Sequence, residues 1–98
     1  MEKIEFEVKI PITVFKDGDC FVANSPLLDL SSYGDTFEEA KKNFTEAAEI
    51  LLEELAEAGT LNQYLFDLGW KKSKKEWSPP VVVAHEFACV EMLLNGRR

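Results

Sequence analysis

Apolar and charged residues alternate along the first part of the chain, which is the pattern of a strand with one buried face. Pro11 has no N–H to donate to a neighbouring strand, so we expect incomplete pairing there. The Asp-Gly pair in "KDGD" predicts a turn and "CFVANS" a second strand, so residues 4–24 are predicted to form a β-hairpin. The apolar positions of the first strand are Ile4, Phe6, Val8, Ile10, Ile12 and Val14.

A third short strand, "LLDLSSY", precedes Gly34, and Thr36 then begins a helix. In "TFEE" the Thr36 hydroxyl can accept from the N–H of Glu39, while the Glu39 carboxylate reaches back to the N–H of Thr36. An apolar stripe at helical spacing follows and predicts a long amphipathic helix, whose stripe should lie on the even face of the first strand. The stripe consists of Phe37, Ala40, Phe44, Ala47, Ala48, Leu51, Leu52 and Leu55.

Gly59 fits the residue after a helix end, and "TLNQ", starting at Thr60, repeats the capping pattern. We therefore predict a short second helix over residues 61–68, ended by Gly69. Residues 81–92, "VVVAHEFACVEM", are strongly β-prone and predict the last strand. Both faces of that strand are largely apolar, so it is either central in a sheet or covered by another chain, which indicates a homodimer or larger homo-oligomer.

This order, β-β-β-α-(short α)-β, predicts an α+β fold with a mainly antiparallel sheet and helices packed on one face. The last strand should lie parallel to the first and beside it. The 98 residues form one domain, 1–98, without a repeat, a signal peptide or a membrane span, and we expect a cytoplasmic protein. Cys20 and Cys89 are isolated, so we interpret them as small core residues in a reducing compartment.

The formal net charge is −7, and it is unevenly distributed. Residues 37–59 carry seven acidic residues against two lysines, whereas residues 60–98 carry more basic than acidic residues. An acidic body repels phosphate backbones and attracts basic proteins over their whole approach. The charge therefore disfavours direct DNA binding and indicates a basic protein partner.

Residues 4–57 resemble the HicB family of type II antitoxins, including small stand-alone HicB-like proteins. The likeness is most specific in "LDLSSYGDTFEEA", and residues 61–70, ending in "LGW", are similar to a subgroup of that family. The resemblance implies a compact β-β-β-α-β domain akin to a truncated ribonuclease H fold that forms homodimers or larger assemblies. It also implies a partner, the small basic HicA-type toxin, which cleaves mRNA through a histidine and which the antitoxin blocks by binding.

Many full-length members of that family append a DNA-binding segment, but only "LLNGRR" follows the predicted last strand here. We expect no C-terminal DNA-binding module. The alternative is a stand-alone oligomeric binding module without a toxin partner, with RNA as one candidate ligand. For RNA, stacking and phosphate contact would come from a segment of tryptophans and lysines. Its members are Trp70, Lys71, Lys72, Lys74, Lys75 and Trp77. We favour the interpretation that these tryptophans are core anchors beside a solvated basic loop.

For a basic protein partner, an acidic surface could form from the odd face of the first strand and nearby acids. We assign to it Glu5, Glu7, Asp17, Asp19 and Asp29, although a merely solvated sheet face explains them equally well.

No catalytic, cofactor or metal site is assigned, and we expect no enzyme. Asp29, Ser31, Ser32 and Asp35 suit a turn and a helix cap, and no base is spaced for nucleophilic chemistry. His85, the sole histidine, has no second ligand at a suitable spacing, so we interpret it as a partly buried strand residue.

Overall fold

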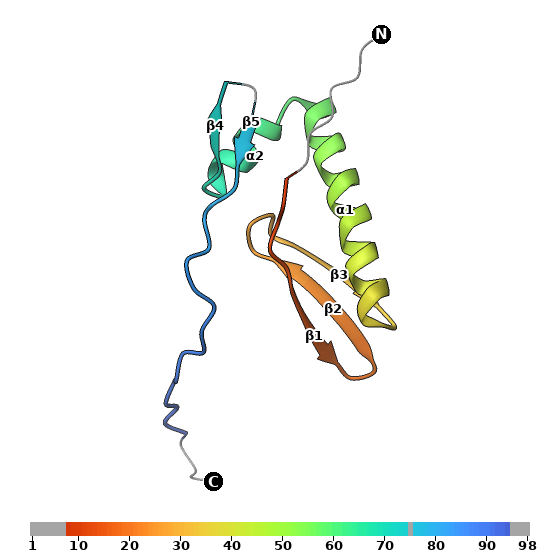
Figure 1. Cartoon of the computed structure of the whole chain (residues 1–98), viewed down its shortest axis with the longest axis vertical. Helices are drawn as coiled ribbons and strands as arrows, with labels where there is room; N and C mark the ends of the chain where they lie inside the picture. Colours follow the sequence, from red (N-terminus) through yellow and green to blue (C-terminus); the bar gives the residue numbers. More distant parts are fainter. Residues whose placement is uncertain (1–7, 75, 95–98) are drawn as a thin grey trace.

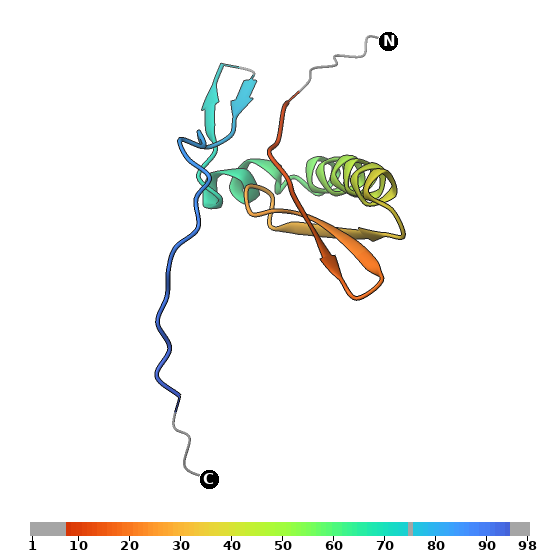
Figure 2. The same cartoon turned by 60° about the horizontal axis from the view of Figure 1, so that its bottom comes forward.

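The computed structural model describes residues 8–74 and 76–94. Its elements are β1 (Thr13–Asp17), β2 (Cys20–Ser25), β3 (Leu30–Gly34), α1 (Phe37–Ala58), α2 (Leu61–Asp67), β4 (Lys71–Ser73) and β5 (Glu76–Ser78). The first three strands form an antiparallel sheet in the order β1-β2-β3, and β4 and β5 form a separate antiparallel hairpin (Figure 1). Figure 2 shows α1 on one side of the three-stranded sheet. The predicted α+β class is confirmed.

The first hairpin forms where the sequence predicts it, but its first strand is shorter. Gly18, with φ 65°, supplies the positive φ that a two-residue hairpin turn needs at its first position. Pairing between β1 and β2 starts at Thr13, which lies opposite Asn24. Because β2 ends at Ser25, almost no β2 backbone remains for the residues before Thr13 to pair with. Residues 8–12 therefore have no strand pairing, and the predicted residues 4–7 lie outside the described part of the chain.

The core lies between the sheet, α1 and α2. The described even-numbered residues of the first segment, Val8, Ile10, Ile12 and Val14, pack against it as predicted. Phe37 is an exception to the predicted helical stripe: its side chain is 46% exposed, since the first turn of α1 lies at the end of the sheet. The buried residues that form this core are Ala23, Leu28, Ala40, Phe44, Ala48, Leu65 and Trp70.

The predicted cap of α1 is present, with one change in its partner. The N–H of Glu39 donates to the Thr36 hydroxyl at 3.0 Å, and the Glu39 carboxylate accepts from the N–H of Asp35 rather than of Thr36, at 2.6 Å. Gly59, with φ 77°, ends the helix as expected.

The predicted side-chain cap of α2 is wrong. The Thr60 hydroxyl caps no N–H of α2, and its backbone is not extended as that of Thr36 is. The reason is that Thr60 also closes α1, where its N–H donates to the Leu55 carbonyl at 3.0 Å. One residue therefore ends the first helix and starts the second, and its conformation serves the first.

The predicted last strand is also wrong. Residues 81–94 form no strand and are exposed throughout, so no strand lies parallel to β1 and beside it among the described residues. Instead, part of the predicted connector forms the β4–β5 hairpin, in which Lys72 lies opposite Trp77. Lys74, with φ 58°, makes the turn. Strand propensity in residues 81–92 is not realised, because after β5 the segment runs apart from β1 and pairs with no strand.

The two cysteines and the histidine are all exposed, contrary to the prediction. Cys20 starts β2 at the exposed end of the hairpin and Cys89 lies in the unpaired C-terminal segment, so neither is the core residue that we predicted. His85 is exposed in the same segment and not partly buried in a strand. In residues 8–74 and 76–94, no helix is both long and apolar enough to cross a membrane.

The cap difference between Thr36 and Thr60 gives a matched test. We expect Thr36→Ala to lower the free energy of unfolding by about 1 kcal/mol, because the hydroxyl is the acceptor for the Glu39 N–H. Thr60→Ala should cost clearly less, since that hydroxyl caps no N–H. Urea denaturation followed by circular dichroism measures both, and equal losses would contradict this account of the caps.

Gly34 is constrained by space rather than by backbone angle. A Cβ on Gly34 would lie 2.7 Å from the Glu39 carbonyl carbon and 2.8 Å from the Ala40 Cα, both main-chain atoms. We expect Gly34→Ala to destabilise the protein by about 2 kcal/mol or more, because the helix must shift away from β3. Gly18→Ala meets no atom within 4 Å. It should cost only about 1 kcal/mol, for the positive φ; thermal denaturation compares the two.

Candidate binding surfaces

The acidic residues assigned from the sequence do not form one patch. Asp17 and Asp19 flank Gly18 at the β1–β2 turn and are exposed. Asp29 is exposed in the turn between β2 and β3, which is the opposite end of β2. Six residues of β2 separate the two ends, roughly 20 Å of extended chain. Glu5 and Glu7 lie outside the described residues. The structure therefore joins Asp17 with Asp19 and separates both from Asp29.

The turn that carries Asp29 is fixed from the C-terminal half of the chain. The Tyr64 hydroxyl donates to the Leu28 carbonyl at 2.6 Å, and the Trp70 indole N–H donates to the Leu27 carbonyl at 2.7 Å. Leu28 itself is fully buried. Burial raises the pKa of Tyr64 above its usual value, and the negative charge of Asp29 raises it further. This turn is thus a rigid structural joint, and Asp29 is its exposed corner.

The proposed RNA-contacting residues divide between core and surface. Trp70 is 4% exposed and hydrogen-bonded, so its ring has no free face on which a base could stack. Trp77 is half-buried, and the Lys72 ammonium lies 5.7 Å from its ring centroid. Lys71, Lys72 and Lys74 are exposed on the β4–β5 hairpin, whereas Lys75 lies outside the described residues. The structure brings the described lysines together on one small hairpin.

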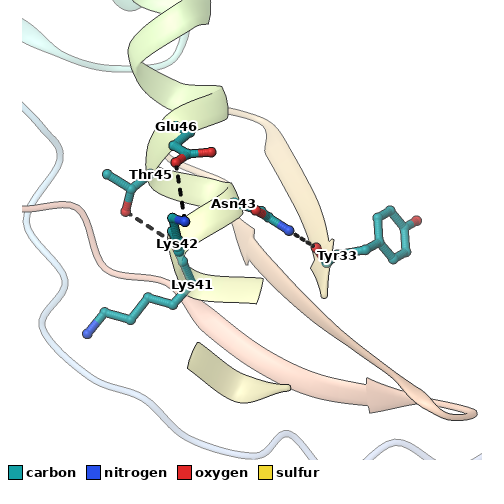
Figure 3. Close-up of polar contacts among 6 residues, drawn as sticks. All are labelled: Tyr33, Lys41, Lys42, Asn43, Thr45 and Glu46. Carbon is teal, nitrogen blue, oxygen red and sulfur yellow. Dashed lines mark hydrogen bonds and ion pairs between the residues drawn. The ribbon is translucent and has the colours of Figure 1, made fainter. Parts of the chain in front are cut away.

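The exposed side of α1 carries more negative charge than any other element of the described chain. Its seven glutamates, against two lysines, are all exposed. Figure 3 shows the helix surface nearest β3, where Asn43 donates to the Tyr33 carbonyl at 2.8 Å and Lys42 lies 4.0 Å from the Glu46 carboxylate. A single exposed ion pair of this kind contributes little to stability. The glutamates are Glu38, Glu39, Glu46, Glu49, Glu53, Glu54 and Glu57.

The sheet face opposite α1 carries a short cross-strand row of apolar side chains. Phe15 lies opposite Val22, and Val22 lies opposite Tyr33. Val22 is 5% exposed between its neighbours, while Phe15 and Tyr33 are about half exposed, at 50% and 59%. In Figure 3 the Tyr33 ring points away from the helix. The sequence did not single out this row, because it depends on the register of three strands.

A groove of about 720 Å³ runs between residues 8–12 and α1. Its floor is mainly apolar, with Ile10, Phe44 and Leu52 among its lining residues. Lys9, Lys41 and Glu49 stand at its rim, so the groove carries one net positive charge in an otherwise acidic protein. The alternating pattern of the N-terminal segment predicted the apolar residues on one side of this groove, but not the groove itself.

The serines and the histidine that could suggest catalysis lie apart. Ser31 and Ser32 belong to β3, and the Ser31 hydroxyl accepts from the Asn24 amide at 2.8 Å. His85 is in the C-terminal segment, outside both the sheet and the helices. Within residues 8–74 and 76–94, no group of three or more His, Cys, Asp or Glu side chains is arranged to hold a metal ion.

Comparison with known protein families, with curated proteins and with solved structures gave no match. The surfaces therefore have to be interpreted from their own chemistry. The described chain is a single small α+β domain with an acidic helix, a lysine-bearing hairpin and an open apolar groove.

The Tyr64 environment gives a pH test. The chain has two tyrosines, so in Tyr33→Phe protein an ultraviolet titration reports Tyr64 alone. We expect a midpoint above 10, which Asp29→Asn lowers only in part, since burial is the larger cause. Because the folded pKa is raised, the stabilisation is present below pH 10 and is lost as pH rises through the folded pKa. Tyr64→Phe should remove this alkaline loss of stability, and an unshifted midpoint would contradict the buried hydroxyl.

Proposed function

We propose that the chain is a HicB-like antitoxin or interaction module that binds and blocks a small basic HicA-type mRNA-cleaving toxin. The order β1-β2-β3-α1 agrees with the first four elements of the β-β-β-α-β arrangement that the resemblance implies. The most specific stretch of that resemblance, residues 28–40, includes β3 and the capped start of α1. A fold alone does not define a function, so the proposal also needs a surface that suits the partner.

The observation that carries the proposal is the acidic surface of α1. Seven exposed glutamates on one 22-residue helix create a strongly negative field, while only two lysines offset it. Such a field accelerates the approach of a basic protein and disfavours nucleic acid. Asp17 and Asp19 add negative charge at the end of the sheet. In this mechanism the toxin is inhibited by occlusion: the bound acidic domain covers the basic surface that the toxin needs for mRNA.

The proposal places the protein in the cytoplasm, where mRNA is cleaved, as a homodimer or larger homo-oligomer. It assigns no DNA-binding role to the described residues, because the net charge of the protein is unfavourable for phosphate contact. Catalysis is left to the partner, and this chain contributes binding surface alone.

One observation favours the second candidate, a stand-alone module that binds RNA. Lys71, Lys72 and Lys74 are exposed together on the β4–β5 hairpin, which is the basic surface that such a module would use. Its stacking capacity is small, since Trp70 is buried and Trp77 is half-buried beneath Lys72. The toxin proposal therefore ranks first.

Co-expression with a small basic HicA-type toxin tests the proposal. The wild-type chain should restore growth, and Glu53→Lys/Glu57→Lys should raise the dissociation constant about tenfold or more and abolish the rescue. Asp17→Lys/Asp19→Lys tests the sheet end in the same way. Lys71→Glu/Lys74→Glu is the matched control: it should leave rescue intact, but would weaken RNA binding in the second candidate. No rescue by the folded wild-type chain would refute the antitoxin proposal.

A further inference from the structure

The C-terminal segment, residues 81–94, is the feature of the structure that most lacks an explanation. It leaves the body after β5 and runs apart from β1 in both views (Figures 1 and 2). Large apolar side chains are exposed along it, including Val83 at 91%, Phe87 at 102% and Leu93 at 99%. A row of exposed apolar side chains on an unpaired strand-forming segment is unfavourable in water and marks a site of association.

The size of the chain in space gives the same indication. Its radius of gyration is 17.3 Å, whereas a compact chain of this length has about 12.6 Å. Its exposed surface is 8447 Å², against about 5,700 Å² for a compact protein of 11.1 kDa. The chain therefore buries less surface on its own than a compact protein of this size does. The described segment that extends farthest from the body is residues 81–94.

The groove between residues 8–12 and α1 lacks a strand, whereas residues 81–94 are a strand-forming segment that lacks a sheet. Residues 8–12 make no backbone pair with another described residue, and beyond them β1 pairs only with β2, so one side of β1 is a free edge. The groove beside them is apolar on its floor. An added strand would pair with this edge and place alternate side chains in the groove. The segment 81–92 has the strand propensity, the apolar side chains and the length to do so.

Charge complements shape at this site. The groove rim carries Lys9, Lys41 and Glu49, one net positive charge. Residues 81–94 carry Glu86 and Glu91 and no lysine or arginine. The segment is thus attracted to the groove, whereas it would be repelled by the glutamates on the solvent side of α1.

The start of the segment indicates which copy it belongs to. Pro79 and Pro80 are half-buried, and Pro80 lies close to Gly69: its Cγ is 3.5 Å from the position of a Cβ on that glycine. This fixed start directs the segment away from its own groove. The groove that the segment can reach is therefore that of a second copy.

We propose that residues 81–92 of each copy add as a strand to the β1 edge of a second copy and fill its groove, forming a dimer by reciprocal exchange. The two exchanges are equivalent under a twofold axis, so the association closes at two copies. This inference does not depend on a toxin or on RNA, and it can hold or fail whichever of those functions is correct.

Sedimentation equilibrium of the full chain gives the first test. Wild type should have twice the mass of the 11.1 kDa chain. Phe87→Asp should raise the dimer dissociation constant about tenfold or more. Phe66→Asp is the matched control, since Phe66 is 69% exposed on α2, outside the groove, and should leave the dimer intact. A monomeric wild type, or a dimer that Phe87→Asp does not weaken, overturns the proposal. Circular dichroism checks that each variant keeps its helices.

The second test distinguishes exchange from docking onto the same chain. A nitroxide is attached through Glu91→Cys in chains whose two exposed cysteines are replaced by serine. These chains are mixed with nitrogen-15-labelled chains that carry no nitroxide. Exchange predicts broadened amide signals from Lys9, Ile10 and Ile12 of the labelled copy. Broadening that occurs only when nitroxide and nitrogen-15 share one chain means that the segment docks on its own sheet, which overturns the proposal.

Discussion

The turn between β2 and β3 is the joint on which the rest of the structure depends. Leu28 is fully buried there, and the two carbonyls at Leu27 and Leu28 accept hydrogen bonds from Trp70 and Tyr64. Those donors come from about forty residues later in the chain, so this turn connects the sheet to everything that follows α1. A buried carbonyl left without its donor would be costly, and this makes the joint specific as well as stable. It also fixes where the β4–β5 hairpin begins.

A second constraint is the limited length of β2. Because β2 ends at Ser25, the chain before Thr13 has no partner strand, and α1 packs mainly over β2 and β3. The result is a free edge and an apolar groove on the β1 side. The C-terminal segment has the opposite property: it is ready to form a strand but has no sheet. Two incomplete parts in one chain are a simple physical basis for self-association.

The charges are arranged so that these surfaces do not compete. Six of the seven glutamates of α1 lie outside the groove, three lysines are gathered on the β4–β5 hairpin, and the groove rim, with Lys9, Lys41 and Glu49, is weakly positive. In the two proposals, a basic partner binds the helix and the C-terminal segment of a second copy occupies the groove. Binding a partner and forming a dimer can therefore occur on different faces of one small domain.

The sequence by itself determined the local structure. The positive φ of Gly18, the Thr36 cap and the apolar stripe of α1 depend on neighbouring residues, which a pattern contains. The sequence could not determine that Thr60 serves the end of α1. Nor could it determine that Trp70 is buried while Lys71 is exposed, or that Asp29 lies far from Asp17. Those outcomes depend on contacts between segments distant in the chain. Above all, the sequence indicated the strand propensity of residues 81–92, but only the tertiary structure decided that this segment pairs with no strand of its own chain.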